Sequence, residues 1–283
     1  MRMKWILSAG LLCLSVSAAR LPESARAAND AHQAILAEGW HTTPAEARQI
    51  EAQLASHPQD VAARSRLISY YYQQMIAGPR ARHILWLIEN HPEAEIFRVA
   101  PEIASLEVTW HGLSSAADQD KARALWLQAA DRFAGDAAVL ADAAQALPIE
   151  ESLRILRRLR TMEPSNLVWT VNLASVYDRA VRDVLSAGGP AQPRVVAASL
   201  RYGNVWLMQL HAAGPELAEK LKSELETSSD AALVGVTGEL LVEQLGALSK
   251  QDQTPQVVKC AAFGEELLKR ARLLDPKNPE WRH

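Results

Sequence analysis

The sequence repeats one helix-ending pattern at an interval of 34 residues. The stretch "ASHPQD" ends an apolar helical pattern at Pro58, and "ENHPEAE" ends a second one at Pro92. Superposition of these two prolines also places Ile50 on Ile84. Proline cannot continue a helix, and it moves the residue before it away from helical backbone angles. A fixed interval of this length indicates a structural repeat, so we expect a series of similar helical units.

The composition favours helix over strand. Ala and Leu are abundant, whereas long runs of β-branched residues are scarce. No segment alternates apolar and polar residues for long enough to require a strand. Apolar residues make up 48% of the chain, which is enough to build a hydrophobic core. We therefore expect an all-α fold.

Several helical stretches share a pattern of small, large and small residues followed by proline. In "AFGEELLKRARLLDP" these residues are Gly264, Leu268, Ala271 and Pro276. The pattern resembles the second helix of the tetratricopeptide repeat (TPR), whose unit has a 34-residue period and two antiparallel helices. The resemblance implies an α-α superhelix, a TPR-like solenoid of antiparallel helix pairs.

In the TPR family the small residues let neighbouring helices approach, and the large residue fills the groove between them. The matching large residues are Trp126 in "KARALWLQAADRFAGD", Leu156 in "LRILRRLRTMEP" and Leu268. Ala134 stands where the first of these stretches would have its proline. In the first-helix stretch "ARSRLISYYYQQM", Tyr71 matches a core position. The resemblance thus implies a core that contains these large and aromatic side chains.

The resemblance also divides the chain into regions. It covers residues 42–180 as TPR-like helical repeats and residues 253–283 as a terminal TPR-like helix and tail. The intervening residues 181–252 diverge from the pattern, but they contain apolar residues at helical spacing and a breaker-rich loop, "GGPAQP". We expect this region to be a divergent helical segment.

Residues 1–27 have the pattern of an export signal. A basic start, "MRMK", precedes the uncharged apolar stretch "WILSAGLLCLSVSA". This stretch is shorter than the roughly 20 apolar residues that span a membrane. Small residues indicate cleavage after Ala18, Ala19 or Ala27, and residues 28–41 are expected to form an N-terminal linker. The mature chain would be periplasmic or extracellular and would have no integral membrane span; an uncleaved membrane anchor is the alternative.

Charge and cysteine content limit the partners and the chemistry. Removal of residues 1–27 takes away four basic residues and one acidic residue, so the formal net charge changes from −3 to −6. Phosphate backbones require basic surface, so we expect no nucleic-acid partner. Cys260 is the one cysteine left after cleavage and cannot form an intramolecular disulfide. Its apolar helical context predicts a small buried side chain.

The sequence contains none of the short motifs that signal catalysis or metal binding. A G-x-S-x-G motif, a Gly-rich phosphate loop, an H-E-x-x-H motif and a cysteine pair are all absent. His83 and His91 are eight residues apart, about two helical turns, and cannot chelate one ion by themselves. We expect no catalytic residue, no metal and no cofactor.

The resemblance further implies a groove, lined by the first helices of the pairs, that binds a peptide or protein partner. Tyrosine combines apolar area with a hydrogen-bonding hydroxyl and therefore suits such an interface. For Tyr72, packing against the neighbouring repeat is the alternative. The candidate groove residues are Ser65, Ser69, Tyr72, Ser175 and Asp178.

Three functions are compatible with these features. The first is an exported, non-catalytic interaction or scaffolding module that holds a partner in its groove. The second is an assembly subunit that self-associates through its C-terminal helix, because only seven residues follow Pro276 and either Trp281 covers the last helix or apolar surface stays exposed. The third is an all-helical enzyme with its site in residues 181–252, which would require a pocket of converging polar groups with shifted pKa values.

Overall fold

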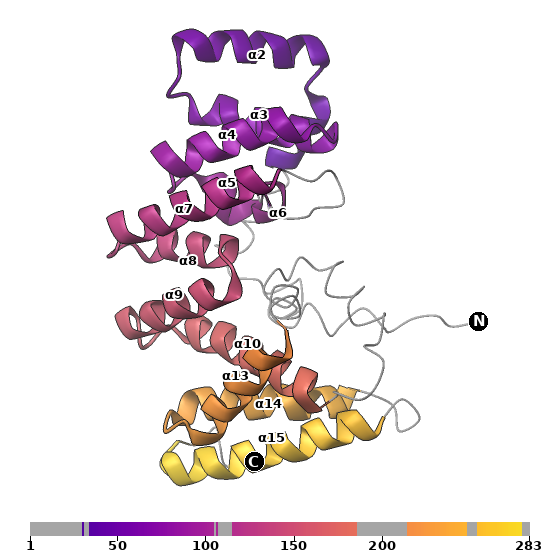
Figure 1. The fold of residues 1–283 in the computed structure, drawn as a ribbon, viewed down its shortest axis with the longest axis vertical. Helices are drawn as coiled ribbons and strands as arrows, with labels where there is room; N and C mark the ends of the chain where they lie inside the picture. Colours follow the sequence, from indigo (N-terminus) through magenta and orange to yellow (C-terminus); the bar gives the residue numbers. More distant parts are fainter. Residues whose placement is uncertain are drawn as a thin grey trace, which may run out of the picture. The chain divides into compact units, whose positions relative to one another are not determined.

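The computed structural model describes residues 30, 34–104, 106, 115–185, 214–247 and 254–278 (Figure 1). Every regular element in these ranges is a helix, and none of them is a strand. The prediction of an all-α fold is therefore confirmed. None of the described helices is long and apolar enough to cross a lipid bilayer. The predicted export signal, residues 1–27, and Trp281 lie outside the described residues.

The chain divides into two compact units between Leu147 and Pro148. We call the described residues up to 147 the N-terminal unit and those from 148 onward the C-terminal unit. The boundary lies inside residues 42–180, which the sequence analysis treated as one region.

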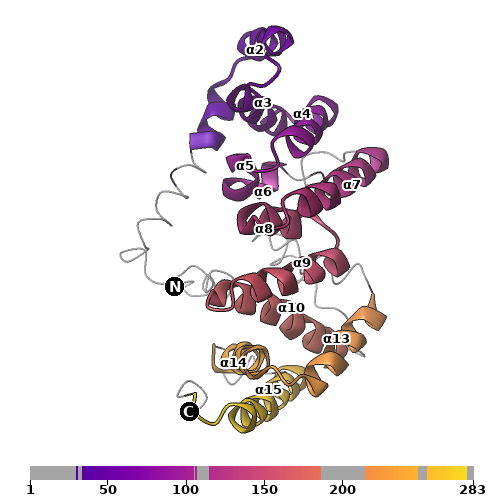
Figure 2. The same ribbon diagram turned by 90° about the vertical axis from the view of Figure 1, so that its left-hand side faces the viewer.

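In the N-terminal unit, helices that follow one another in sequence pack together. The helices are α2 (Pro44–Ser56), α3 (Val61–Gln73), α4 (Ala77–Asn90), α5 (Glu95–Val99), α6 (Pro101–Ala104), α7 (Ala116–Arg132) and α8 (Ala137–Ala146). Helix α3 contacts α2 and α4, α4 contacts α7, and α7 contacts α8, while the short α5 and α6 lie against α8 (Figure 2).

The C-terminal unit is built around α10. Its helices are α9 (Ile149–Met162), α10 (Leu167–Leu185), α13 (Pro215–Thr227), α14 (Ala231–Ala247) and α15 (Pro255–Leu274). Helix α10 contacts the other four, and α14 and α15 form the most extensive helix pair (Figure 2). Helix α14 belongs to the region that the sequence analysis regarded as divergent, and it is the packing partner of the terminal α15.

Residues 34–41 form a helix, although the sequence analysis expected a linker over residues 28–41. Just after this helix, Thr42 Oγ1 donates a hydrogen bond to the carbonyl oxygen of Glu38 at 2.6 Å. Arg66 of α3 donates from Nε to the same Thr42 oxygen at 2.8 Å. These two bonds attach the segment to the N-terminal unit.

The predicted proline stops end the helices as expected. The residue before each proline is the C-cap of a helix, with φ between −126° and −140° and ψ between 61° and 81°. These C-cap residues are His57, His91, Glu163 and Asp275, which end α2, α4, α9 and α15. A following proline disfavours helical angles in its predecessor, so the same local chemistry ends four helices in the same way.

Each of these stops is also the first residue of a four-residue turn. The carbonyl oxygen of His57 accepts a hydrogen bond from the backbone N–H of Asp60 at 3.2 Å, with Pro58 at the second position, where proline is favoured. The Asp60 carboxylate then accepts from the N–H of Ala63 and caps the start of α3. Asn166 caps the start of α10 in the same way, because its Oδ1 accepts a hydrogen bond from the backbone N–H of Val168.

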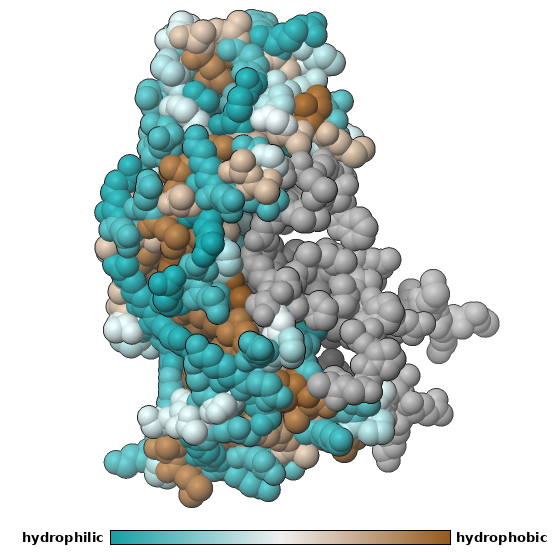
Figure 3. Space-filling view, in the orientation of Figure 1, coloured by the Kyte–Doolittle hydropathy of each residue, from teal (hydrophilic) through white to brown (hydrophobic). Residues whose placement is uncertain are grey.

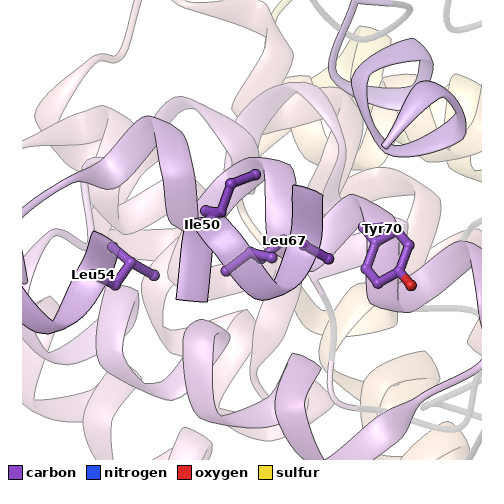
Figure 4. Close-up of a cluster of buried hydrophobic side chains, with 5 residues drawn as sticks. Ile50, Leu54, Leu67 and Tyr70 are labelled. Carbon is purple, nitrogen blue, oxygen red and sulfur yellow. The ribbon is translucent and has the colours of Figure 1, made fainter. Parts of the chain in front are cut away.

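The core of the N-terminal unit includes a cluster between α2 and α3 (Figure 4). Its members are Ala47, Ile50, Leu54, Leu67 and Tyr70. Tyr70 is buried, whereas Tyr71, the predicted core residue, is half-buried. Tyr71 packs against the cluster, and its hydroxyl donates to Glu51 at 2.8 Å, which keeps the ring at the polar edge of the cluster.

Two of the three predicted large core residues are buried. Trp126 packs its ring edge-on against Phe97, and Leu156 is fully covered. Leu268 is half-buried, while its neighbour Leu267 takes the buried position. Hydrophilic residues cover much of the described surface in the view of Figure 3, and separate hydrophobic patches lie between them. The apolar side chains therefore lie largely inside each unit.

Two glycines bring α14 and α15 into very close contact. A Cβ at Gly264 would lie 2.8 Å from the carbonyl oxygen of Gly238, and a Cβ at Gly238 would lie 2.8 Å from the carbonyl oxygen of Gly264. Real Cβ atoms do not approach backbone atoms so closely. The sequence pattern places Gly264 at a position where a small residue is expected to let neighbouring helices approach, and this contact confirms that reason.

Gly238→Ala and Gly264→Ala should each push α14 and α15 apart. The free energy of unfolding should fall by about 1–3 kcal/mol for either change, which is typical of an overpacked interior. Chemical denaturation followed by circular dichroism measures this loss.

Gly78→Ala in α4 is the matched control, because a Cβ there would meet nothing within 4 Å. It should leave stability unchanged or raise it by up to about 1 kcal/mol, since alanine favours helix more than glycine does. Equal losses at Gly78 and Gly264 would contradict the close-contact explanation.

Candidate functional site

The candidate groove residues of α3 are only partly accessible. Ser65 and Tyr72 are half-buried, and the Arg80 guanidinium lies 5.5 Å from the centre of the Tyr72 ring. Ser69 differs from the expectation: it is fully buried, because helix 34–41 passes over it so closely that a side chain at Gly39 would collide with it. The chain itself thus covers part of the surface that the resemblance assigned to a partner.

The candidate groove residues of α10 take part in local hydrogen bonds. The Ser175 hydroxyl donates to the carbonyl oxygen of Val171 one turn earlier, at 2.9 Å. Asp178 accepts two hydrogen bonds from Arg182, which also donates to the carbonyl oxygen of Leu240 in α14 at 3.0 Å. Asp178 therefore helps to join α10 to α14. Because the α3 and α10 residues belong to different units, the structure does not assemble the five within either unit.

The C-terminal unit contains an open cleft of about 710 Å³ that the sequence analysis did not assign. Helices α9, α10, α13 and α14 and the turn 228–230 form its walls. The lining residues are Arg157, Arg160, Thr161, Pro164, Leu173, Tyr177, Glu224, Thr227, Ser228, Ser229, Asp230 and Leu233. Leu173, Tyr177 and Leu233 are buried and form an apolar floor, while charged and hydroxyl side chains form the rim.

One side of the cleft is fixed by a triangle of hydrogen bonds. Arg157 of α9 donates from Nη2 to the Tyr177 hydroxyl and to Oε2 of Glu224, both at 2.8 Å. The Tyr177 hydroxyl donates to the same Glu224 oxygen at 3.0 Å. Three helices, α9, α10 and α13, thus meet at one guanidinium nitrogen.

A second arginine of α9, about one turn after Arg157, also lines the cleft. Arg160 forms a two-pronged ion pair with Asp230, in which Nη2 donates to Oδ1 at 2.7 Å and Nη1 donates to Oδ2. Asp230 Oδ1 also accepts from the backbone N–H of Leu233 at 3.1 Å and so caps α14. The position of Arg160 therefore depends on the start of α14.

Arg270 of α15 binds the backbone at the end of α13 and in the turn that leads to α14. Arg270 donates from Nη1 to the carbonyl oxygens of Leu225 and Glu226, at 2.9 and 2.5 Å, and from Nη2 to that of Ser228. A guanidinium at the end of a helix satisfies free carbonyl groups and matches the negative end of the helix dipole. The cleft wall at residues 228–230 is therefore braced by a third helix.

The electrostatics keep these groups in their ordinary charge states. Burial alone would lower the pKa of Arg157, but hydrogen bonds and charges from Tyr177 and Glu224 outweigh it and raise that pKa. Burial, above all, raises the pKa of the Tyr177 phenol. Burial would also raise the pKa of Asp230, yet Arg160 and nearby backbone N–H groups lower it overall. None of these shifts moves a group toward neutral pH, where general acid–base catalysis works best.

The N-terminal unit holds a second polar cluster, with a different geometry. His83 Nδ1 lies 3.3 Å from Nη1 of Arg64, and His83 Nε2 lies 3.0 Å from Oε1 of Glu51. Arginine can only donate, so Nδ1 accepts and the neutral ring donates from Nε2 to the carboxylate. Burial is the main cause of the lowered pKa of His83, which favours the same neutral form. Arg64 occupies Nδ1 of His83, the nitrogen that would otherwise accept a proton from a nucleophile. The cluster instead links α2, α3 and α4 through Glu51, Arg64 and His83.

The outer face of α15 bears on the self-association hypothesis. Its exposed charged residues are Lys259, Glu265, Glu266 and Lys269. Exposed apolar side chains occur at its two ends, at Val258 and at Leu273 and Leu274. A polar outer face is what closes a helical array, so the middle of α15 offers little apolar surface for a second copy.

The sequence carries one signal for the cleft. Four arginines occur in "RILRRLR", residues 154–160, with apolar residues between them at helical spacing. Their acidic partners could not be found from this signal, because Glu224 and Asp230 follow Arg157 and Arg160 by 67 and 70 residues.

Comparison of the chain with protein-family models, with curated proteins and with solved structures gives no match. In the described part of the chain, no three His, Cys, Asp or Glu side chains gather in a way that could hold a metal ion. The cleft is therefore interpreted from its own residues.

Asp142 of α8 is a buried carboxyl group whose two oxygens have no hydrogen-bond partner among the described residues. Burial raises its pKa to about 7, although the charge of Arg98 opposes the shift. The folded unit keeps this proton up to about pH 7, whereas the unfolded chain loses it near the ordinary pKa of 3.8. The contribution of Asp142 to stability therefore becomes less favourable as pH rises from about 4 to 7, and above pH 7 the penalty is complete.

Asp142→Asn should stabilise the protein more at pH 8 than at pH 5, because the amide is neutral at both. One pKa unit corresponds to about 1.4 kcal/mol, so the gain at pH 8 should exceed that at pH 5 by roughly 1–3 kcal/mol. Thermal unfolding at the two pH values measures the difference. Asp131→Asn, the same change at an exposed position of α7, should show none. If the stability change caused by Asp142→Asn depended on pH no more than that caused by Asp131→Asn, burial would not raise the pKa of Asp142.

Proposed function

We propose that this protein is an exported, non-catalytic interaction module that binds a segment of a partner protein in the cleft of its C-terminal unit. The cleft replaces the α3 and α10 groove residues as the binding site. The helix pairs and their recurring proline turns support a TPR-like repeat architecture for the chain. The basic and apolar N-terminal pattern of residues 1–27 supports export, so the partner would be a periplasmic or extracellular protein.

The observation that carries the proposal is the combination of an apolar floor with a fixed polar rim. Leu173, Tyr177 and Leu233 form an apolar floor that a side chain of the ligand can contact. Arg157 and Arg160 are held in place by carboxylates, so they need little further ordering when a ligand binds. Sites that combine a few placed polar groups with apolar area are typical of binding pockets.

The same geometry favours binding over catalysis. Among the described residues, no histidine lines the cleft beside its serine and threonine hydroxyls, and its two carboxylates are engaged by arginines. A nucleophile needs a base within hydrogen-bond reach. The enzyme hypothesis placed its site in residues 181–252, and the cleft does draw Glu224 and Asp230 from that region, but both serve as partners of arginines.

The test is a selection of binding peptides from an unbiased random display library, with the full mature chain as bait. Ser229→Trp should weaken the selected peptides about tenfold or more, because the indole of this exposed rim residue would fill the cleft. Isothermal titration calorimetry gives the two dissociation constants.

Ser223→Trp is the matched control. Ser223 is an exposed residue of α13, the helix that precedes the turn with Ser229, and it does not line the cleft. Affinity should stay within a factor of about two, as for a change outside an interface. If Ser229→Trp and Ser223→Trp retain the same affinity, or if no peptide is selected, the cleft is not the binding site.

A further inference from the structure

His83 of α4 is a buried, titratable side chain at the junction of three helices. Its two ring nitrogens face groups of opposite charge. Nδ1 lies 3.3 Å from Nη1 of Arg64 in α3, and Nε2 lies 3.0 Å from Oε1 of Glu51 in α2. The neutral ring fits both neighbours, because it accepts from the guanidinium and donates to the carboxylate. We call these three side chains the three-helix joint.

Arg64 is held on two further sides. Its Nη2 and Nε donate to the carbonyl oxygen of Pro58 at 2.8 and 3.2 Å, and its Cζ lies 3.6 Å from the centre of a ring of Trp86 in α4. Arg64 therefore connects the turn between α2 and α3 to α4. A guanidinium has no acceptor, so a hydrogen on Nδ1 of His83 would point at a positively charged donor. A second proton on the ring replaces this hydrogen bond by a contact between two cations.

Glu51 opposes this effect, because its carboxylate attracts a charged ring. The same oxygen, Oε1, also accepts from the Tyr71 hydroxyl at 2.8 Å and lies 3.7 Å from Nη2 of Arg82. Burial, above all, raises the pKa of Tyr71 to about 12, so this hydroxyl keeps its proton and continues to donate. Glu51 is thus already shared among three partners, and it compensates only part of the cost of a second proton on His83.

The charged groups around His83 determine the net direction. Burial is the largest effect and lowers the pKa of His83, Glu51 raises it, and Arg64 and Arg82 lower it. Helix α7 also packs against α4, but none of its described residues adds a charge that acts on His83. The net result is a lowered pKa, so the joint holds the ring in its neutral form.

We propose that His83 makes the three-helix joint sensitive to acid: the joint is closed while the ring is neutral, and it opens when the ring takes up a second proton. The second proton binds to Nδ1, the nitrogen that accepts from Arg64, and one nitrogen cannot do both. The device does not rest on the proposed function, because no residue of the N-terminal unit lines the cleft.

The direction of the pH effect follows from the lowered pKa of His83. In the unfolded chain the ring takes up its second proton near the ordinary value of 6.5, whereas in the closed joint it does so at a lower pH. Well above pH 6.5 the ring is neutral in both forms, and the joint has its full stability. As the pH falls from 6.5 through the lowered pKa, opening becomes more favourable, because the open form binds more protons.

The first measurement is an NMR titration of the full mature chain with 15N-labelled histidine, in which comparison with His83→Asn identifies the His83 signals. At neutral pH the ring should carry its hydrogen on Nε2, and its titration midpoint should lie below 6.5. Arg64→Met should raise this midpoint, because it removes the positive charge beside Nδ1. Glu51→Gln should lower it further, because it removes the opposing charge. A ring that only fills space would not respond to its two neighbours in opposite directions.

Hydrogen exchange of α2, α3 and α4 then measures the opening of the joint. At each pH, the exchange rate of the wild-type chain is divided by that of His83→Asn, which cancels the intrinsic effect of pH on exchange and the contribution of Asp142. Asparagine offers an amide oxygen to Arg64 but takes up no proton. The ratio should rise about threefold or more when the pH falls from 7.5 to 5. With His57→Asn, the same change at an exposed residue at the end of α2, the corresponding ratio should stay constant.

Several outcomes overturn the inference. A His83 midpoint at or above 6.5, or a hydrogen on Nδ1 at neutral pH, would show that the joint does not exclude the second proton. A ratio for His83→Asn that stays constant with pH, or that changes no more than the ratio for His57→Asn, would show that protonation does not open the joint. If His83→Asn does not fold, the signal that moves in opposite directions in Arg64→Met and Glu51→Gln identifies His83, and the absence of such a signal contradicts the inference.

Discussion

The four-residue turn at the end of a helix is the constraint on which the described structure depends. Its first residue leaves helical angles because proline follows, and its last residue can begin the next helix through a side-chain cap, as Asp60 does for α3. One helix end and one helix start are thus satisfied within four residues. Connections this short make consecutive helices antiparallel neighbours. Where Ala134 replaces proline, the turn still forms, because Asp136 accepts from the N–H groups of Ala138 and Val139.

The sequence predicted the parts of the fold that local chemistry determines. Proline stops, the small residue at Gly264 and the buried Trp126 all follow from rules that act over one or two helical turns. Tyr71 and Leu268 pack where the pattern placed them, Tyr71 against the α2–α3 cluster and Leu268 against Gly238 of α14, but both are only half-buried, and the adjacent Tyr70 and Leu267 are buried more deeply. A helix turns by about 100° per residue, so a single long-range contact, such as the Tyr71 hydroxyl on Glu51, decides which neighbour faces the core.

The candidate site could not be predicted in the same way. Arg157 is positioned by Glu224 of α13 and Arg160 by Asp230 of the turn that follows α13, and the intervening chain contains a region without repeat pattern. The groove residues expected from the resemblance belong to stretches that match its first helix, whereas the arginines belong to α9, whose sequence resembles its second helix. The arginine run of residues 154–160 was visible, but an arginine run can equally be a solvated helix face until its partners are known. The site therefore depends on side-chain pairs between segments far apart in the sequence, and local sequence patterns do not show which residues pair.

The carboxylate that positions Arg157 also limits how a ligand can approach it. Glu224 occupies the Nη2 side of the guanidinium, and a second carboxylate on that side would be repelled by it. Both two-donor forks of a guanidinium include Nη2, which already donates to Tyr177 and Glu224, so Arg157 has no free pair of parallel donors for a second carboxylate. Because the Tyr177 and Glu224 contacts already restrict the Arg157 side chain, little rotamer entropy is lost when a ligand in the cleft contacts it. The ion pair that stabilises the packing of α9 against α13 thus supplies both orientation and repulsion, and specificity in binding needs both.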